Sequence, residues 1–308
     1  MSTSLIIGAG GQDGRLLTDH LKNQHEKLVL VGNGWISWEN QTKEKFDLFS
    51  QKEVEALVLK IRPDRIFYLA AFHHSSSQAE HLEESSIWEK SEATHVTGFR
   101  FLLESTKKAE IETRIFYAAS SLVFGNPESA PQNEDTPFNP VCVYGITKTT
   151  GVHIAQYYRK LHQMHIDVGY LYTHESPLRS NAFVAKKIVN GLKDVHAGKE
   201  TELVLGDLNA RVDWGYAQDY VQAIDLIGHQ AKSNDYIIAT GESHSVREFA
   251  EIGCRILGLS FEKTVRESNN QTLRKRRNLV GDFSRLKKAT GWTPSMSFEK
   301  MVQKLFEV

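Results

Sequence analysis

Cysteine is scarce in this chain: Cys142 and Cys254 are the two thiols among 308 residues. Two cysteines are too few for a disulfide framework, and neither has a C-x-x-C neighbour or a group of other metal ligands around it in the sequence. The sequence therefore predicts reduced thiols, a cytoplasmic location and no metal centre.

Long apolar runs and an excess of charge are also missing. No run approaches the roughly 20 apolar residues of a membrane span, and no basic, apolar leader precedes Leu5. Lys and Arg number 37 against 38 Asp and Glu, which gives a net charge of -1. This balance gives no long-range attraction to nucleic acid or to an anionic membrane, so we expect neither as a partner. An anionic ligand must be held by local groups, such as the basic run at 274–277.

What the chain does have is an alternation of short β-rich runs with helical patterns. With 40% hydrophobic residues, it can bury a full core in one large or two unequal domains. The alternation predicts an α/β fold, a Rossmann-type doubly wound parallel sheet covered by helices on both faces. We expect strands at 4–7, 27–31, 46–48, 65–71, 113–119 and 166–171.

The pattern becomes irregular after residue 172. We expect residues 1–172, joined by parts of 207–240, to form the dinucleotide-binding domain, and 173–308 to form mainly a small α/β substrate-binding domain. Within the second part, the pattern predicts a helix near 183–196 and a short strand at 202–206.

A glycine-rich turn follows the first expected strand. Gly8, Gly11 and Gly14 have the G-x-x-G-x-x-G spacing, with Gln12 and Asp13 between the last two glycines. Missing side chains there let a pyrophosphate approach the amides and the positive dipole end of the next helix. A plain tight turn is the alternative, but the position after the first strand favours a dinucleotide site.

The end of the second expected strand distinguishes the two nicotinamide cofactors. An acid there would bind the free ribose 2′-hydroxyl of NAD, and an arginine would favour the 2′-phosphate of NADP. Here the strand runs into Gly32 and Asn33, which supply neither charge. With no cation for the phosphate, we expect NAD, and NADP stays open.

Tyr144 and Lys148 are four residues apart in a predicted helix, so they lie on one face, one turn from each other. A nearby ammonium and a ribose 2′-hydroxyl would favour tyrosinate and let the phenol exchange a proton with a substrate hydroxyl. By itself the spacing also fits an ordinary surface pair. Ser120, which closes a strand upstream, and the glycine turn favour the catalytic interpretation.

His73 and His74 follow the fourth expected strand, at the carboxyl end where open α/β sheets bind ligands. Two adjacent histidines suggest a metal, but no further His, Cys or carboxylate stands at ligand spacing nearby. We expect His74 to line a pocket, and a merely solvated loop is the alternative.

These stretches together resemble the extended short-chain dehydrogenase/reductase superfamily, and within it the GDP-mannose 4,6-dehydratase family. The resemblance is carried by Gly8 to Gly14, Tyr144 to Lys148, His174 to Arg179, Asp213 to Gly215, and Ala239 to Phe249. Family members oxidise C4 of a GDP-hexose by passing hydride to a bound nicotinamide, eliminate water across C5 and C6, and return the hydride at C6.

The resemblance implies a role for each site residue. Tyr144 would be the C4-hydroxyl base, Lys148 would orient the ribose, and Ser120 would hydrogen-bond the reacting oxygen. Cofactor contacts are implied at Gly8, Gly11, Gln12, Asp13, Gly14, Asn33, Asp47, Leu48, Leu69, Ala70 and Ala71. Contacts to a GDP-sugar are implied at His74, Ser121, Leu122, Thr173, Arg179, Lys187, Arg211 and Arg276. A homodimer or homotetramer is implied as well.

Departures from the family pattern change the expected reaction. The family segment resembles S-T-S-E-L-Y-G, and its Glu serves the C5 proton transfer, whereas this chain has Leu122 there. The double arginine for the NADP phosphate is replaced by Gly32 and Asn33, the loop after it is shortened, and Val212 replaces the arginine before Asp-Trp-Gly. We therefore expect a 4-dehydrogenase or 4-keto reductase that acts on a GDP-linked manno-configured hexose or heptose without elimination. A GDP-mannose 4,6-dehydratase-type lyase, a C4 epimerase and a non-catalytic nucleotide-binding paralogue stay open.

Overall fold

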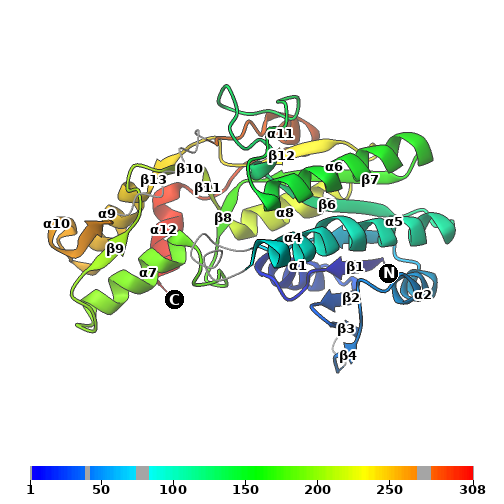
Figure 1. Cartoon of the computed structure of the whole chain (residues 1–308), viewed down its shortest axis with the longest axis horizontal. Coiled ribbons are helices and arrows are strands. Elements are labelled where there is room, and N and C mark those ends of the chain that lie inside the picture. Colours follow the sequence, from blue (N-terminus) through cyan, green and yellow to red (C-terminus); the bar gives the residue numbers. More distant parts are fainter. Residues whose placement is uncertain (1, 39–41, 74–82, 269–278, 308) are drawn as a thin grey trace.

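The computed structural model describes residues 2–38, 42–73, 83–268 and 279–307. Its centre is an eight-stranded sheet (Figure 1). The strands lie in the order β12 (Asp235–Ile238), β7 (His165–Leu171), β6 (Arg114–Ser120), β5 (Arg65–Tyr68), β1 (Thr3–Ile7), β2 (Lys27–Gly32), β3 (Trp35–Trp38) and β4 (Glu44–Lys45). From β12 to β2 all neighbours are parallel, and β3 and β4 are antiparallel additions at one edge.

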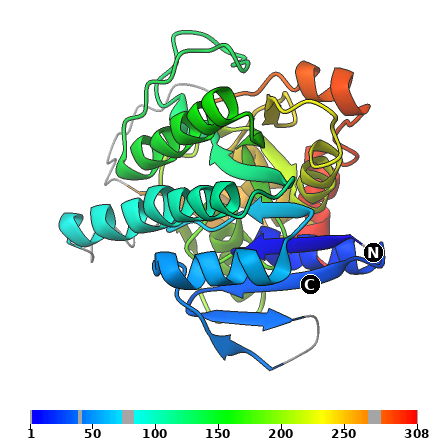
Figure 2. The same cartoon turned by 90° about the vertical axis from the view of Figure 1, so that its right-hand side faces the viewer.

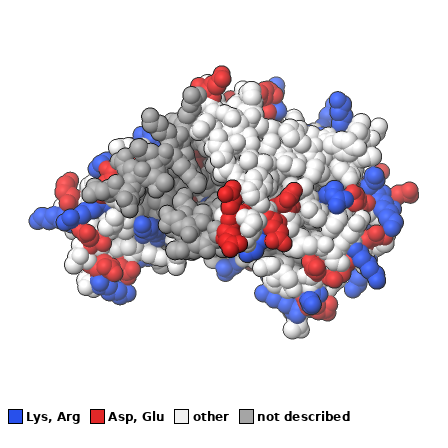
Figure 3. Space-filling view, in the orientation of Figure 1, with Lys and Arg blue, Asp and Glu red and all other residues white. Residues whose placement is uncertain are grey.

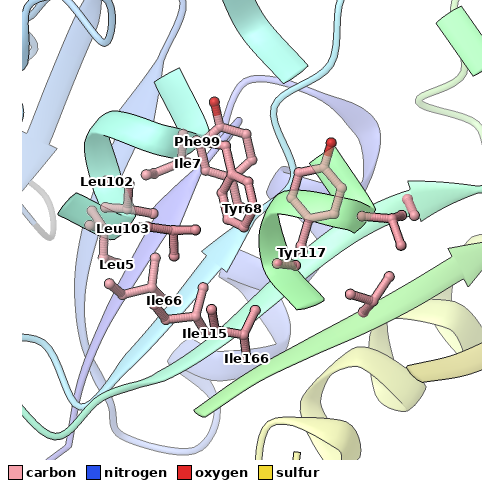
Figure 4. Packing of buried hydrophobic residues seen from close by; sticks show 14 of the residues in the cluster. Leu5, Ile7, Ile66, Tyr68, Phe99, Leu102, Leu103, Ile115, Tyr117 and Ile166 are labelled. Carbon is pink, nitrogen blue, oxygen red and sulfur yellow. The ribbon is translucent and has the colours of Figure 1, made fainter. Parts of the chain in front are cut away.

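Helices cover both faces of the sheet, as the view along it shows (Figure 2). One face carries α2 (Gln51–Ile61), α4 (Glu84–Glu92), α5 (Gly98–Lys108) and α6 (Val143–His162), and the other carries α1 (Gln12–Lys22), α8 (Ala217–Ile227) and α11 (Ser284–Thr290). Each parallel strand is apolar on both sides, so Leu5 and Ile7 pack into one core and Ile6 into the other. Figure 4 shows part of the first core. The Rossmann-type doubly wound prediction is confirmed.

The expected strand at 46–48 is wrong. The chain turns back after β2 through Asn33 and Gly34, and β3 pairs antiparallel with β2. Asn-Gly is a strong two-residue hairpin signal, and Gly34 has φ +75°. Gly32 leaves room for the Trp35 indole, since a Cβ at Gly32 would lie 2.0 Å from that ring. Hairpin chemistry therefore overrides the βαβ pattern at this edge.

A smaller lobe lies at the left in Figure 1. It contains three two-stranded pairs, β8 (Thr173–Glu175) with β11 (Trp214–Tyr216), β9 (Leu203–Leu205) with β14 (Val265–Glu267), and β10 (Arg211–Val212) with β13 (His244–Ser245). Around them lie α7 (Val184–His196), α9 (Val246–Leu257), α10 (Phe261–Thr264) and α12 (Phe298–Phe306). These elements share a third apolar core that includes Trp214 and Phe249. The chain leaves the sheet after β7 and returns to it through α8 and β12.

One buried carboxylate holds the junction of the two lobes. Asp213 is 1% exposed and accepts hydrogen bonds from the amides of Thr240, Gly241 and Gly281 at 2.9–3.1 Å. The Thr240 hydroxyl donates to it as well, at 2.6 Å. Burial raises the pKa of Asp213, and these donors counteract that rise. Asp213, the first residue of the Asp-Trp-Gly motif, therefore ties the backbone at 240–241 to that at 281.

Charges are interspersed at the surface. In Figure 3, Lys and Arg lie among Asp and Glu around the rim of the face shown, and a broad area at its upper right, over α6, carries uncharged side chains. Within the described residues, no helix is long and apolar enough to cross a membrane.

Candidate active site

The glycine turn lies between the ends of β1, β5 and α1. Gly8 has φ +96°, and a Cβ there would lie 2.6 Å from the Ala70 amide nitrogen. A Cβ at Gly14 would lie 2.3 Å from the Gly8 carbonyl oxygen. Gly11 caps α1 without a side-chain hydrogen bond, so the first amides of the helix are not screened by a cap. This cradle fits the pyrophosphate of a dinucleotide.

The other residues expected to bind the cofactor differ in their position relative to this turn. The strand order puts the end of β1 between the ends of β2 and β5, which brings Asn33, Leu69 and Ala70 to the same sheet edge as the glycines. Asp47 is exposed, and its carboxylate accepts the Phe49 amide. Leu48, half-buried, packs toward Gly98 at the start of α5. Ala71 is exposed just past β5.

Gln12 and Asp13 connect the glycine turn to the segment that begins with β8. The Asp13 carboxylate lies 2.9 Å from His174 Nε2, and the Ser176 hydroxyl donates to Gln12 Oε1 at 2.8 Å. Burial raises the pKa of Asp13, but His174, Gln12 and Arg179 outweigh it and hold the pKa at about 2. These contacts therefore link the glycine turn to the His-Glu-Ser-Pro motif at 174–177.

Tyr144 and Lys148 lie in the first turns of α6. Lys148 is 1% exposed, and its ammonium donates to the Ala118 carbonyl at 2.7 Å. It lies 5.9 Å from the centre of the Tyr144 ring. Both side chains therefore face the carboxyl end of the sheet, where β5 and β6 end.

Burial controls the protonation of this pair. It lowers the pKa of Lys148 to about 7, against the attraction of Asp13. Burial also raises the pKa of Tyr144, and the positive charge of Arg179 partly counteracts this rise. In the free protein the tyrosine is therefore neutral and the lysine is only partly charged near neutral pH, and a bound anion favours the charged form of the lysine.

Ser120 and Leu122 lie beside the start of α6. Ser120 ends β6, and its hydroxyl oxygen accepts the Leu122 amide at 3.2 Å. The short 3₁₀ helix η2 (Ser121–Val123) packs so closely on α6 that a Cβ at Gly145 would lie 2.5 Å from the Leu122 carbonyl. Ser121 is buried within this turn. The segment at 120–122 and the start of α6, both predicted from the sequence to be catalytic, are thus brought together.

Arg179 is the expected substrate cation that lies nearest to this centre. It stacks on Phe183 with 3.5 Å from its guanidinium carbon to the ring centre, and its Nε lies 3.4 Å from Glu175. The Phe183 ring in turn lies 4.8 Å from His73. The rings of Phe183 and His73 therefore connect Arg179 to Tyr144.

The other expected substrate residues differ in position. Thr173 pairs with Trp214 in the β8–β11 ladder, and Lys187 is exposed on α7. Arg211 donates to Ser243 from the edge of the small lobe and lies 3.5 Å from Glu248. His74 and Arg276 lie outside the described residues.

Two histidine rings flank Tyr144, and of these the sequence pointed to His73 but not to His95. His73 and His95 lie with their ring centres 4.8 and 5.0 Å from that of Tyr144, both at steep angles. His95 comes from the middle of a long helix, where a lone histidine gives no motif. Among the described residues there is no group of three or more His, Cys, Asp or Glu side chains that could hold a metal ion.

Comparison with known proteins gives the family. A model of the GDP-mannose 4,6 dehydratase family matches residues 5–305. GDP-mannose 4,6 dehydratase 2 of Arabidopsis thaliana is 32% identical over 327 residues, covering 99% of this chain and 86% of that protein. The GDP-mannose 4,6-dehydratase of Vibrio cholerae is 28% identical, covering 97% of this chain and 91% of that protein.

Solved structures share the fold at low identity. RMD from Pseudomonas aeruginosa, complexed with NADPH, has a TM-score of 0.86 at 18% identity and covers 100% of this chain and 98% of its own. A UDP-glucose 4-epimerase from Thermotoga maritima has a TM-score of 0.83 at 19% identity and covers 99% and 97%. The family match over almost the whole length decides the assignment: this chain belongs to the GDP-mannose 4,6-dehydratase family.

Proposed function

We propose that this protein is an NAD(P)-linked oxidoreductase that acts at C4 of a GDP-linked manno-configured hexose or heptose and releases no water from the sugar. The observation that carries the proposal is Leu122, which stands next to the catalytic helix where the resembling dehydratases have their elimination glutamate. Family membership supports a nucleotide-sugar substrate. NAD and NADPH in related structures support a nicotinamide cofactor.

Each residue of the relay has one task. Tyr144 exchanges the proton of the C4 hydroxyl, and the charge of Lys148 makes the tyrosinate accessible. Ser120 already accepts the Leu122 amide, so its own proton is available to donate to the C4 oxygen. The nicotinamide, when bound, supplies or accepts the hydride at C4.

Elimination needs a further base for the C5 proton, and the described acids near Tyr144 are already engaged. Asp13 is paired with His174. Glu175 is 1% exposed and lies beside Arg179. A leucine at 122 gives no proton acceptor, and a lost acid/base typically costs about 10²–10⁴-fold in rate.

The second candidate function is a 4,6-dehydratase. The family match favours it, and so does His73, whose ring lies 4.8 Å from that of Tyr144. An imidazole there is a possible substitute for the missing carboxylate. In that case His73→Gln should abolish dehydration and leave C4 oxidation.

Mass spectrometry of the products separates the two functions. The protein is incubated with NAD or NADP and either GDP-mannose or GDP-mannoheptose in deuterated water. A 4-keto product lighter by two hydrogens, with C6 still hydroxylated, supports the oxidoreductase. A 6-deoxy product lighter by one water, with deuterium at C5, would establish the dehydratase.

A further inference from the structure

His95 lies in a π-helical turn, η1 (Ala93–Thr97), between α4 and α5. The Gly98 amide bonds the Ala93 carbonyl, five residues back, instead of the usual four. Insertions of this kind occur often at functional sites.

Two tyrosine hydroxyls hold the backbone of this turn. Tyr68 donates to the Thr94 carbonyl at 2.6 Å, and Tyr117 donates to the His95 carbonyl at 3.1 Å. The two rings stand on neighbouring strands, β5 and β6 (Figure 4). A Cβ at Gly151 of α6 would lie 2.0 Å from the Tyr117 hydroxyl, so glycine permits this approach. The turn is therefore fixed against the sheet.

The His95 side chain is fully buried, and each ring nitrogen has one partner. The Phe72 amide lies 3.0 Å from Nε2, and an amide can only donate, so Nε2 accepts. Nδ1 then carries the proton and donates to Thr147 Oγ1 at 2.7 Å. The Thr147 hydroxyl in turn donates a hydrogen bond to the Val143 carbonyl at 2.9 Å. The imidazole therefore connects the loop after β5 with the first turn of α6.

This connection requires a neutral ring. A proton on Nε2 would set an N–H against the Phe72 N–H and break the bond. Burial lowers the pKa of His95, and the nearby Lys148 lowers it further, so the ring stays neutral at physiological pH.

We propose that His95 is a positioning residue that holds two halves of the active site in register. Its Nε2 fixes the chain just past Leu69 and Ala70, which border the glycine turn, and its Nδ1 fixes the turn that carries Tyr144. The first contact supports cofactor binding, and the second supports proton transfer. The catalytic half of this proposal rests on the proposed function, and the cofactor half does not.

Two substitutions separate the two contacts. His95→Asn keeps a donor near the position of Nδ1 and loses Nε2, and His95→Gln keeps an acceptor near Nε2 and loses Nδ1. We expect His95→Asn to weaken NAD binding about tenfold in calorimetry, the cost of one lost hydrogen bond. We expect His95→Gln to bind NAD normally but to lower kcat by about 10²-fold, because the phenol is misplaced.

Amide hydrogen exchange gives a readout that needs no sugar. Exchange at Phe72 should become faster in His95→Asn and in His95→Leu, and stay as in the wild type in His95→Gln. Leu102→Ala, in the core of α5, is the control that lowers the melting temperature without touching either contact. It should leave NAD affinity and Phe72 exchange unchanged.

Equal behaviour of the Asn and Gln variants, or wild-type exchange and NAD affinity in His95→Leu, would overturn the proposal. A wild-type protein that turns over no nucleotide sugar would refute the proposed function instead. The exchange and calorimetry results would then still decide the role of the His95 contact with Phe72.

Discussion

The relay at Tyr144 depends on burial more than on any single charge. The phenol is held neutral by its surroundings, and the ammonium of Lys148 has backbone carbonyls as its described partners in the free protein. A bound anionic cofactor therefore favours the charged form of that ammonium.

Tyr144→Phe should retain cofactor binding and lower turnover by about 10²–10⁴-fold, because the acid/base is lost while the ring packing stays. Steady-state kinetics on the accepted GDP-sugar measures this. Tyr157→Phe, on the exposed side of the same helix, is the matched control and should behave as wild type. Near-normal turnover of Tyr144→Phe would show that Tyr144 is not the acid/base.

We predict that cofactor binding depends on pH because of Lys148. Its pKa is about 7 in the free protein, and a bound anionic cofactor favours the charged form, so binding raises this pKa. Below pH 7 the lysine is already charged. Above it, binding takes up a proton, and affinity should fall by up to about tenfold per pH unit. Calorimetry in buffers of different ionisation enthalpy detects the uptake, which Lys148→Met should abolish. No proton uptake at pH 8 in the wild type would contradict the prediction.

The same lysine affects stability. Its folded-state pKa lies below its unfolded value of 10.5, so the unfolded chain binds more protons between about pH 7 and 10.5. Burying the charged lysine therefore lowers the free energy of unfolding most below about pH 7, and this loss of stability decreases as the pH rises from about 7 to 10.5.

Arg179→Ala should raise KM more than it lowers kcat, because a cation that holds the diphosphate contributes equally to ground and transition states. Arg179→Lys should recover part of the loss, since it keeps the charge but not the planar fork that stacks on Phe183. Lys199→Ala, at an exposed position after α7, is the control. An unchanged KM in Arg179→Ala would mean that this loop does not reach the substrate.

At the scale of elements, the hairpin of β2 and β3 reshapes the adenosine end of the cofactor site. Trp35 lies over Gly32 and beside Gly10 of the glycine turn, and the Lys43 ammonium lies 4.1 Å from the centre of its indole ring. A cation near the end of β2 is what a 2′-phosphate requires.

We expect NAD to bind at least as tightly as NADP, because Gly32 and Asn33 carry no charge. Lys43→Ala should weaken NADP and leave NAD unchanged, since only the phosphate is attracted to the ammonium. Lys45→Ala, two residues along the chain, is the control. Calorimetric titration of both cofactors tests both expectations: a clear NADP preference in the wild type would refute the first, and an unchanged NADP affinity in Lys43→Ala would refute the second.

Elements with strong periodicity were predictable, and elements set by single contacts were not. The helix that carries Tyr144 and Lys148 and the parallel strands β1, β2, β5, β6 and β7 follow from apolar patterns that any such sheet needs, whereas the parallel strand β12 was not expected. Asn33 and Gly34 favour a hairpin after Gly32, but the prediction followed the expected βαβ alternation instead. The π turn at His95 could not be predicted, because it depends on Tyr68 and Tyr117 reaching it from distant strands.

At the scale of the molecule, α6 carries an exposed stripe with apolar members. Ile146, Tyr157 and Leu161 are 37%, 53% and 60% exposed and recur along one side of the helix. Figure 3 shows the uncharged area over this helix. The family resemblance implies a homodimer or homotetramer, and we propose that two subunits meet through this face, which would bury the stripe.

Leu161→Glu should therefore shift the protein from dimer to monomer in light scattering coupled to gel filtration, because burying an unpaired charge in an interface is costly. Val204→Glu, 43% exposed in the small lobe, is the matched control and should leave the mass unchanged. A monomeric wild type would refute this interface.

The carboxylate of Asp213 also constrains how the chain folds during synthesis. Its four donors come from Thr240, Gly241 and Gly281, so the last of them follows Asp213 by 68 residues. A nascent chain that ends before Gly281 has a complete glycine turn and catalytic helix but leaves this buried acid without its last donor. The sheet can begin to form on the ribosome, whereas the set of donors to Asp213 is complete only after Gly281 has emerged.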